Sequence, residues 1–132
     1  MNHEFDTIVD RIHSFDTRYH VDAYEFVMEA LSYTQRKFRA IKHVTGEELL
    51  EGMKELLLDE YGPMTITVLK FWGINSTQDF GHIVFNLVNN SVLSQTQDDT
   101  IDTFKDAYDF QEVFDRGYRK QLYKKISRMR VI

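Results

Sequence analysis

The residues of this chain that are best placed for binding chemistry lie near its C-terminus. They recur at positions i, i+3, i+4, i+7 and i+8, the spacing that gathers side chains on one face of a helix: Arg116, Arg119, Lys120, Tyr123 and Lys124. Four cations and one aromatic ring on a single face can bind phosphates and stack on a base, or they can pair with carboxylates of a protein. We therefore take this face as the candidate binding site.

Charge is divided unevenly along the 132 residues, whose formal net charge is −5. Residues 116–132 hold seven Lys and Arg and no acidic residue, whereas residues 1–115 hold 9 basic against 21 acidic residues, a net charge of −12. Such segregation indicates an anionic partner or pairing of the helix with its own acidic body. Three interpretations stay open: a solvated helix end that pairs loosely with the body, a contact with RNA through phosphates, and docking to an acidic protein surface or another copy.

No set of residues has the spacing of a catalytic or metal site. "DFG" at Asp79 to Gly81 lacks the glycine-rich loop and the catalytic-loop signature of a kinase, so Asp79 is expected to cap a helix. There is no cysteine, and the five histidines show no paired spacing: His3, His13, His20, His43 and His82. The acidic run "DDTIDTFKDAYD" lacks the central Gly and the terminal Glu of a calcium loop. We expect no catalytic residue, cofactor or metal, and keep an enzyme of unknown class as a second alternative.

Apolar residues recur at helical spacing through most of the chain. They predict an amphipathic helix over residues 4–15 and a long helix over 23–41. Thr45 and Glu48 form a capping box for a third helix, and "YGPM" marks a corner before a helix at 63–72 that should be among the most buried. Asp109 and Glu112 are expected to cap the last helix. Its inner side should pack on the body through residues spaced by four: Phe110, Phe114, Tyr118, Leu122 and Ile126.

The stretch "FWGINSTQDFGHIVFNLVNNSVL" is typical of a helix-turn-helix. Gly73 can end one helix, Ile74 can fill the corner, and Ser76 with Asp79 can open the next helix, over residues 77–90. "SVLS" and "IDTFK", separated by "QTQDDT", favour a β-hairpin. We therefore predict a mainly α (α+β) fold: a winged-helix-like helical domain with one small β-hairpin and a C-terminal amphipathic helix. Residues 1–132 form a single domain, with a body at 1–108 and a basic helix and tail at 109–132.

Sequence-specific DNA binding is not expected from this fold. Residues 77–90, which would read the bases, contain no Lys or Arg, and the predicted hairpin carries Asp98, Asp99 and Asp102. Because phosphate neutralisation by cations supplies most non-specific DNA affinity, the duplex would repel such a surface.

Three long stretches resemble a family of small uncharacterised bacterial proteins known mainly from planctomycete and verrucomicrobial genomes. They are "YHVDAYEFVMEALSYT", "HVTGEELLEGMKELLLDEYGPMTITVLKFWGI" and "STQDFGHIVFNLVNNSVLSQTQDDTIDTFKDAYDF", and they span Tyr19 to Phe110. The family has no established activity, so the resemblance implies no catalytic residue. It does not cover the basic tail from Arg116 onward.

The chain lacks the features of a membrane or exported protein. It has no apolar run of about 18 residues, and its start, "MNHEFDTIVDRIHSF", does not have the pattern of a signal peptide. With the apolar side of the last helix on the body, we expect no membrane contact and a cytoplasmic location. The preferred function is a non-enzymatic interaction module whose acidic body and basic terminal helix contact a protein partner or another copy.

Overall fold

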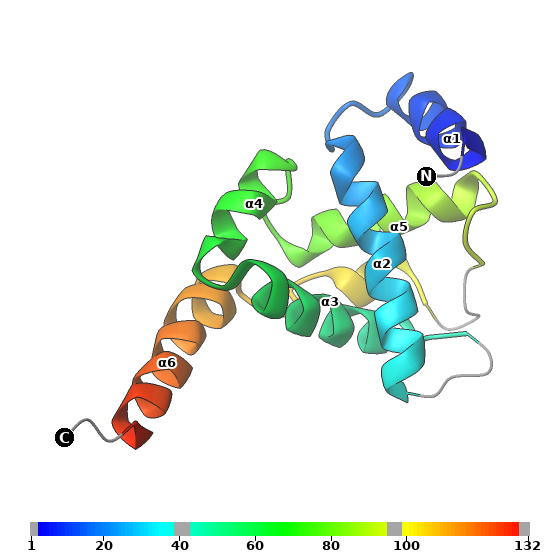
Figure 1. The fold of residues 1–132 in the computed structure, drawn as a ribbon. Helices are drawn as coiled ribbons and strands as arrows, with labels where there is room; N and C mark the ends of the chain where they lie inside the picture. Colours follow the sequence, from blue (N-terminus) through cyan, green and yellow to red (C-terminus); the bar gives the residue numbers. More distant parts are fainter. Residues whose placement is uncertain (1–2, 39–42, 95–98, 130–132) are drawn as a thin grey trace.

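The structure, a computed structural model, describes residues 3–38, 43–94 and 99–129, and these are helical with no strand among them (Figure 1). Six α-helices follow one another: α1 His3–His13, α2 Val21–Phe38, α3 Gly46–Tyr61, α4 Thr65–Phe71, α5 Thr77–Asn89 and α6 Gly117–Arg128. Three short helical turns connect them: the 3₁₀ turns η1 Gly62–Met64 and η2 Ile101–Phe104, and the π turn η3 Gln111–Arg116.

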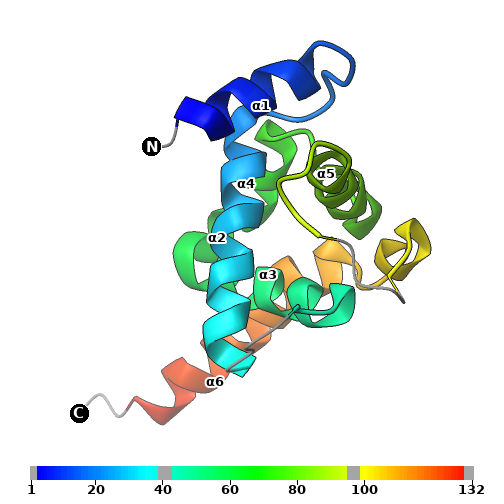
Figure 2. The same cartoon turned by 90° about the vertical axis from the view of Figure 1, so that its right-hand side faces the viewer.

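Helix α2 is the centre of the arrangement. α1 crosses the N-terminal end of α2, and α3 and α5 pack against α2. Helix α6 leaves the body at the end opposite α1 (Figures 1 and 2). Helix α3 buries one apolar side, at Leu49, Leu50, Met53, Leu56 and Leu57. One hydrophobic core joins these residues to buried side chains of α2 and α5.

The closest approach of α2 and α3 occurs at Gly52. A Cβ at this position would lie 1.9 Å from Oγ1 of Thr34, far inside van der Waals contact. Thr34 is itself buried and donates its hydroxyl hydrogen to the carbonyl oxygen of Ala30 at 2.7 Å. A residue without a side chain is therefore required where the two helices touch.

The predicted helix starts and corners are confirmed. The amide of Glu48 donates to Oγ1 of Thr45, and the Glu48 carboxylate accepts the Thr45 amide in return. Gly73 has a φ of 87°, and a Cβ there would meet the carbonyl oxygen of Arg18 at 2.2 Å. Asp79 accepts the amide of Ser76 at the start of α5 and also the hydroxyl of Tyr19 at 2.6 Å, so its role as a cap is confirmed.

The winged-helix prediction is wrong because the described residues contain no β-hairpin. Ile101–Phe104 form the 3₁₀ turn η2, and the part of "QTQDDT" at 95–98 lies outside the described residues. The carbonyl oxygen of Phe104 accepts the hydroxyl of Thr77 at 2.6 Å, and the buried Phe104 side chain lies so close to Gly81 that a Cβ there would clash. This segment is bonded to α5, and no strand among the described residues pairs with it.

Other expectations about burial need correction. Phe15 is exposed because α1 ends at His13, two residues before it. Helix α4 buries Leu69, but Phe71 and the preceding Met64 face solvent, so the segment 63–72 is less buried than predicted. The end of the predicted 23–41 helix falls partly outside the described residues, which show α2 to Phe38.

We expect the substitution Gly52→Ala to destabilise the protein, although alanine normally favours a helix by about 1 kcal/mol over glycine. The added methyl group must push Thr34 aside, which should lower the free energy of unfolding by about 1–3 kcal/mol. In Gly52→Ala/Thr34→Ala the hydroxyl contact is gone, so the double variant should be more stable than the sum of the single effects predicts. Urea unfolding measures all three, and a Gly52→Ala variant as stable as the wild type would contradict the close approach.

Candidate functional site

The C-terminal helix begins as predicted and is continuous. Oδ1 of Asp109 accepts the amide hydrogen of Glu112 at 2.9 Å, which caps the first turn. The π turn η3 then leads directly into α6, and Gly117 between them has helical angles of −62° and −43°. Gly117 therefore does not break the helix.

Aromatic rings anchor the start of this helix on the body. Phe114 is 2 % exposed, and its ring centroid lies 5.4 Å from that of Phe110 and 6.0 Å from that of Tyr108. Phe110 in turn contacts Phe80 of α5, and the Tyr118 ring lies against Gly62 at the end of α3. The first half of the predicted inner side, Phe110, Phe114 and Tyr118, thus contacts the body.

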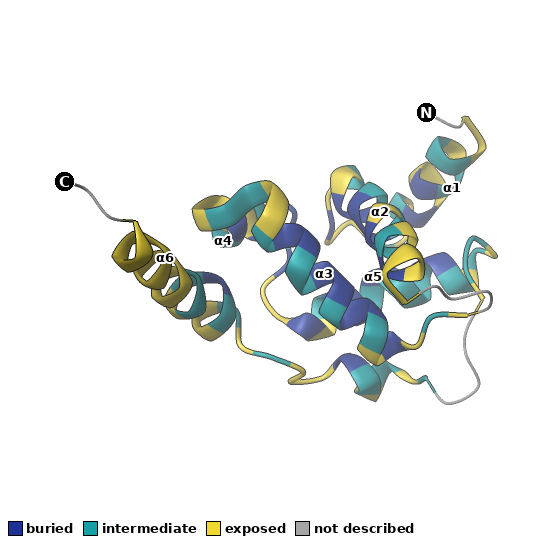
Figure 3. Cartoon of the chain, turned by 60° about the horizontal axis from the view of Figure 1, so that its bottom comes forward, coloured by how far each residue is buried: buried dark blue, intermediate teal, exposed yellow. Residues whose placement is uncertain are grey.

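The second half of the inner side is exposed, so the prediction that Leu122 and Ile126 pack on the body is wrong. Leu122 is 42 % exposed and Ile126 is 52 % exposed. Every residue from Arg119 to Met129 is in the exposed class, and Figure 3 draws the outer turns of α6 as exposed around their circumference. The π turn η3, which precedes α6, contacts η1 and α4, and α6 then extends away from these elements (Figure 1).

The structure brings together four of the five predicted site residues. Arg116, Lys120, Tyr123 and Lys124 line one shallow hollow on the outer surface of α6, together with Ser127 and Arg128. Arg119 belongs to a different hollow, at the junction with Pro63, Phe114 and Leu122. Sequence reasoning missed Arg128, which continues the face at i+4 from Lys124 and was therefore visible in the spacing.

Ion pairs neutralise the first two cations of the basic face, Arg116 and Arg119. Nη1 of Arg116 lies 2.8 Å from Oε2 of Glu112, and Nε of Arg119 lies 2.7 Å from Oδ1 of Asp115. Both are i, i+4 pairs within the helix, a spacing that the sequence already contains. Among the residues that the structure describes, the remaining cations of α6 form no ion pair: Lys120, Lys124, Lys125 and Arg128.

An exposed apolar stripe lies beside these cations. Leu122, Ile126 and Met129 follow Tyr118 along one side of α6, at helical spacing, and all three are exposed. We call this set, Leu122, Ile126 and Met129, the apolar stripe. Beyond Tyr118, α6 is therefore amphipathic, and both its cationic side and its apolar side are exposed.

Negative charge is dense on the body where α2 approaches the end of α3. Burial is the main reason that the pKa of the Tyr61 hydroxyl is raised. The negative charges of Glu60, Glu29 and Asp22 raise it further. The hydrogen bond that protonated Glu60 donates to Glu29, burial, and the negative charge of Glu29 raise the pKa of Glu60 to about 7. No ion pair joins Glu29, Asp59 or Glu60 to a Lys or Arg within residues 3–38, 43–94 and 99–129.

The described residues contain neither a cluster of metal-binding side chains nor a membrane-spanning helix. No three His, Asp or Glu side chains there are placed to hold a metal ion together. None of the described helices combines the length and the apolar character needed to cross a bilayer.

No protein family, curated protein or solved structure matches this chain. The resemblance to small planctomycete and verrucomicrobial proteins therefore stays a prediction. Function has to be inferred from the geometry of α6 and the charges around it.

Substitutions along one side of the terminal helix should separate the anchor from the projecting part. Phe114→Ala removes a buried ring and should lower the free energy of unfolding by about 3–5 kcal/mol. Ile126→Ala, about three turns later on the same side, should change it by less than about 0.5 kcal/mol because the residue is exposed. Urea unfolding of both variants measures the difference, and a large loss in Ile126→Ala would mean that this end of α6 packs on the body.

The carboxyl group of Glu60, which lies beside Glu29, should make stability depend on pH. Because the pKa of Glu60 is about 7 in the folded protein and ordinary, near 4.5, in the unfolded chain, the folded state binds this proton more tightly. Its contribution to stability is therefore present at acidic pH and lost as the pH rises from about 4.5 through about 7.

Glu60→Gln should consequently raise the melting temperature at pH 8 relative to the wild type, with little difference at pH 4.5. Glu25→Gln, which removes a charge from α2 without touching this pair, serves as the control. Thermal unfolding followed by circular dichroism between pH 4.5 and 8 gives the comparison. If the melting temperatures of the wild type and Glu60→Gln depended on pH in the same way, the raised pKa of Glu60 would be refuted.

Proposed function

We propose that this protein is a non-enzymatic interaction module that docks α6 onto an acidic protein surface, with another copy of the chain as the first candidate partner. One observation carries the proposal: the apolar stripe and four cations without ion pairs lie side by side on a helix that projects from the body. Both kinds of side chain gain free energy only from a surface that is apolar and acidic at once.

The apolar stripe favours docking over a merely solvated helix end. A solvated end needs cations near the negative pole of the helix, which Lys125 and Arg128 supply, but it does not need apolar residues at regular spacing. Burying one Leu, Ile or Met side chain stabilises a complex by about 1.5–3 kcal/mol. A helix that presents residues at i, i+4 and i+7 to a groove is a common mode of peptide recognition, and the apolar stripe has this spacing.

Charge complementarity supports another copy as a partner. Residues 1–115 carry a net charge of −12, and Glu29, Asp59 and Glu60 form no ion pair with a Lys or Arg of the described residues. Cations of a second α6 would relieve the repulsion between these carboxylates. Such a contact joins two different surfaces, α6 of one copy and the acidic body of another. The assembly is therefore closed only if the copies form a ring or if two copies each dock α6 onto the other.

RNA binding is the alternative that a specific observation favours. Tyr123 is exposed in the same hollow as Lys120 and Lys124, where a base could stack while the cations contact phosphates. This alternative gives no role to Leu122 and Ile126. An anionic membrane surface would use the stripe and the cations together, so the experiment must include it. Nothing in the described residues favours an enzyme, and α5 offers no cation for sequence-specific DNA binding.

Two variants of α6 separate these possibilities by light scattering over a range of salt concentrations. Leu122→Ser/Ile126→Ser removes the stripe and keeps the charge, while Lys120→Glu/Lys124→Glu reverses the charge and keeps the stripe. We expect the wild type to self-associate at low salt, and both variants to associate at least tenfold more weakly. Phe15→Ser, which removes an exposed apolar residue after α1, at the end of the body opposite α6, should behave like the wild type.

The same variants define the contradicting results. Retention on poly(U) that Lys120→Glu/Lys124→Glu loses and Leu122→Ser/Ile126→Ser keeps, with a monomeric wild type, would replace the proposal by RNA binding. Sedimentation with phosphatidylserine vesicles that both variants lose would replace it by membrane-surface binding. A monomeric wild type that also captures no protein in an α6-dependent manner would refute docking.

A further inference from the structure

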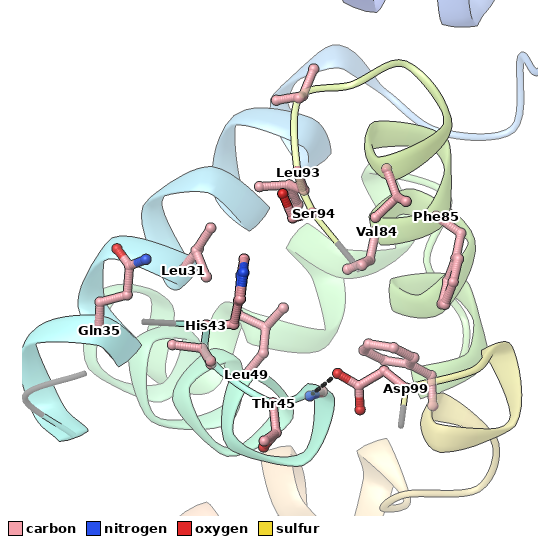
Figure 4. A pocket seen from close by; sticks show the side chains of 15 residues that line it. Leu31, Gln35, His43, Thr45, Leu49, Val84, Phe85, Leu93, Ser94 and Asp99 are labelled. Atoms are coloured by element: carbon pink, nitrogen blue, oxygen red, sulfur yellow. Dashed lines mark hydrogen bonds between the residues drawn. The ribbon is translucent and has the colours of Figure 1, made fainter. Parts of the chain in front are cut away.

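A half-enclosed cavity of about 220 Å³ lies at the beginning of α3, at the opposite end of this helix from the α6 anchor. Its apolar lining comes from α2, the residues just before α3, α3 itself, α5 and the segments that follow α5: Leu31, Val44, Leu49, Val84, Phe85, Val88, Val92, Leu93 and Phe104. Figure 4 shows several of these side chains converging on one space from different elements.

The size of the space exceeds what ordinary packing leaves empty. Protein interiors contain few voids larger than a water molecule, and an apolar cavity of about 150 Å³ in another protein is enough to bind benzene. Most of the apolar lining residues here are only partly buried, including Leu31, Val84 and Val88. Their remaining exposed surface faces a space that one compact molecule can fill.

Polar groups at the rim favour a neutral ligand with a hydrogen-bond donor. The rim includes the amide of Gln35, the imidazole of His43 and the carboxylate of Asp99, all of which can accept a hydrogen bond. Figure 4 shows the His43 ring rising into the space between α2 and α5. Asp99 also accepts the amide hydrogen of Gly46 at 2.9 Å, which holds it in place at the start of α3. A carboxylate at the rim of a body with a net charge of −12 disfavours an anionic ligand.

Two aromatic side chains in the wall favour an aromatic occupant. The rings of Phe85 and Phe104 are perpendicular, with centroids 6.3 Å apart, in an edge-to-face pair. A third ring placed beside them gains the same kind of contact in addition to the burial of its surface.

We propose that this cavity is a binding site for a compact, neutral, mainly aromatic molecule of about bicyclic size that carries one N–H or O–H donor. The donor is directed at the acceptors of the rim, and the rings fill the space between Leu49, Val88 and Phe104. The site shares no residue with α6, so it stands or fails independently of the proposed docking function.

Indole is a suitable probe because it is bicyclic, neutral and has a single N–H donor. Titration of the full-length protein, followed by the methyl signals of its Leu, Val and Ile residues in NMR spectra, should give saturable shifts at Leu49, Val84 and Val88. Benzofuran has the same shape but carries an oxygen in place of the N–H group. We expect it to bind at least threefold more weakly.

Val88→Phe places a ring in the cavity and should weaken indole binding at least tenfold. Val68→Phe makes the same change on α4, away from the cavity, and should leave the affinity unchanged. If Val88→Phe does not fold, Val92→Phe, from the segment after α5, tests the same point. Shifts that stay linear up to the solubility of indole, or equal affinities for the wild type and a folded filled variant, would overturn the site. Equal affinities for indole and benzofuran would overturn the assigned donor.

Discussion

The contact between α2 and α3 at Gly52 and Thr34 fixes the geometry on which the rest of the molecule depends. Because Gly52 has no side chain, α2 and α3 approach until the Thr34 hydroxyl lies directly against the backbone of Gly52. Neither helix can slide along the other without a clash at this point. The 16 residues of α3 span about 24 Å. The N-terminal end of α3 borders the cavity, and its C-terminal end contacts Tyr118 and the aromatic anchor of α6. One helix therefore sets the positions of both candidate sites.

The order of α6 has a local origin, because its outer turns gain nothing from tertiary packing. An isolated helix of 12 residues is marginal in water. This one continues from a turn held by the buried Phe114, carries i, i+4 ion pairs at its start, and ends with cations at the negative pole. The helix is thus presented in folded form before any partner is bound.

Local signals in the sequence were sufficient for the helices, their caps and the corner at Gly73, because each depends on residues within a few positions of one another. The hairpin prediction failed at Ile101–Phe104, where an alternation over four residues also fits a 3₁₀ turn, and the bond from Thr77 to Phe104 decides between them. The prediction that the inner side of the last helix packs on the body was correct up to Tyr118. Periodicity marks an apolar side but does not say where the body ends, so the exposure of Leu122 and Ile126 was not predictable. The cavity was invisible because its walls come from segments far apart in the chain.

The two candidate sites are expected to act independently, and the reason is mechanical. A ligand in the cavity stabilises the folded state by mass action, but it can change the affinity of α6 for a partner only through an element with two arrangements of different energy. The element that joins the sites is α3, and its shift along α2 is blocked at Gly52. The anchor of α6 rests on α3 through the hydrogen bond from the Tyr108 hydroxyl to the Leu50 carbonyl oxygen, and its rings, Tyr108, Phe110 and Phe114, do not line the cavity. Coupling would thus require α3 to move as a whole, and the packing of Thr34 against Gly52 opposes that movement.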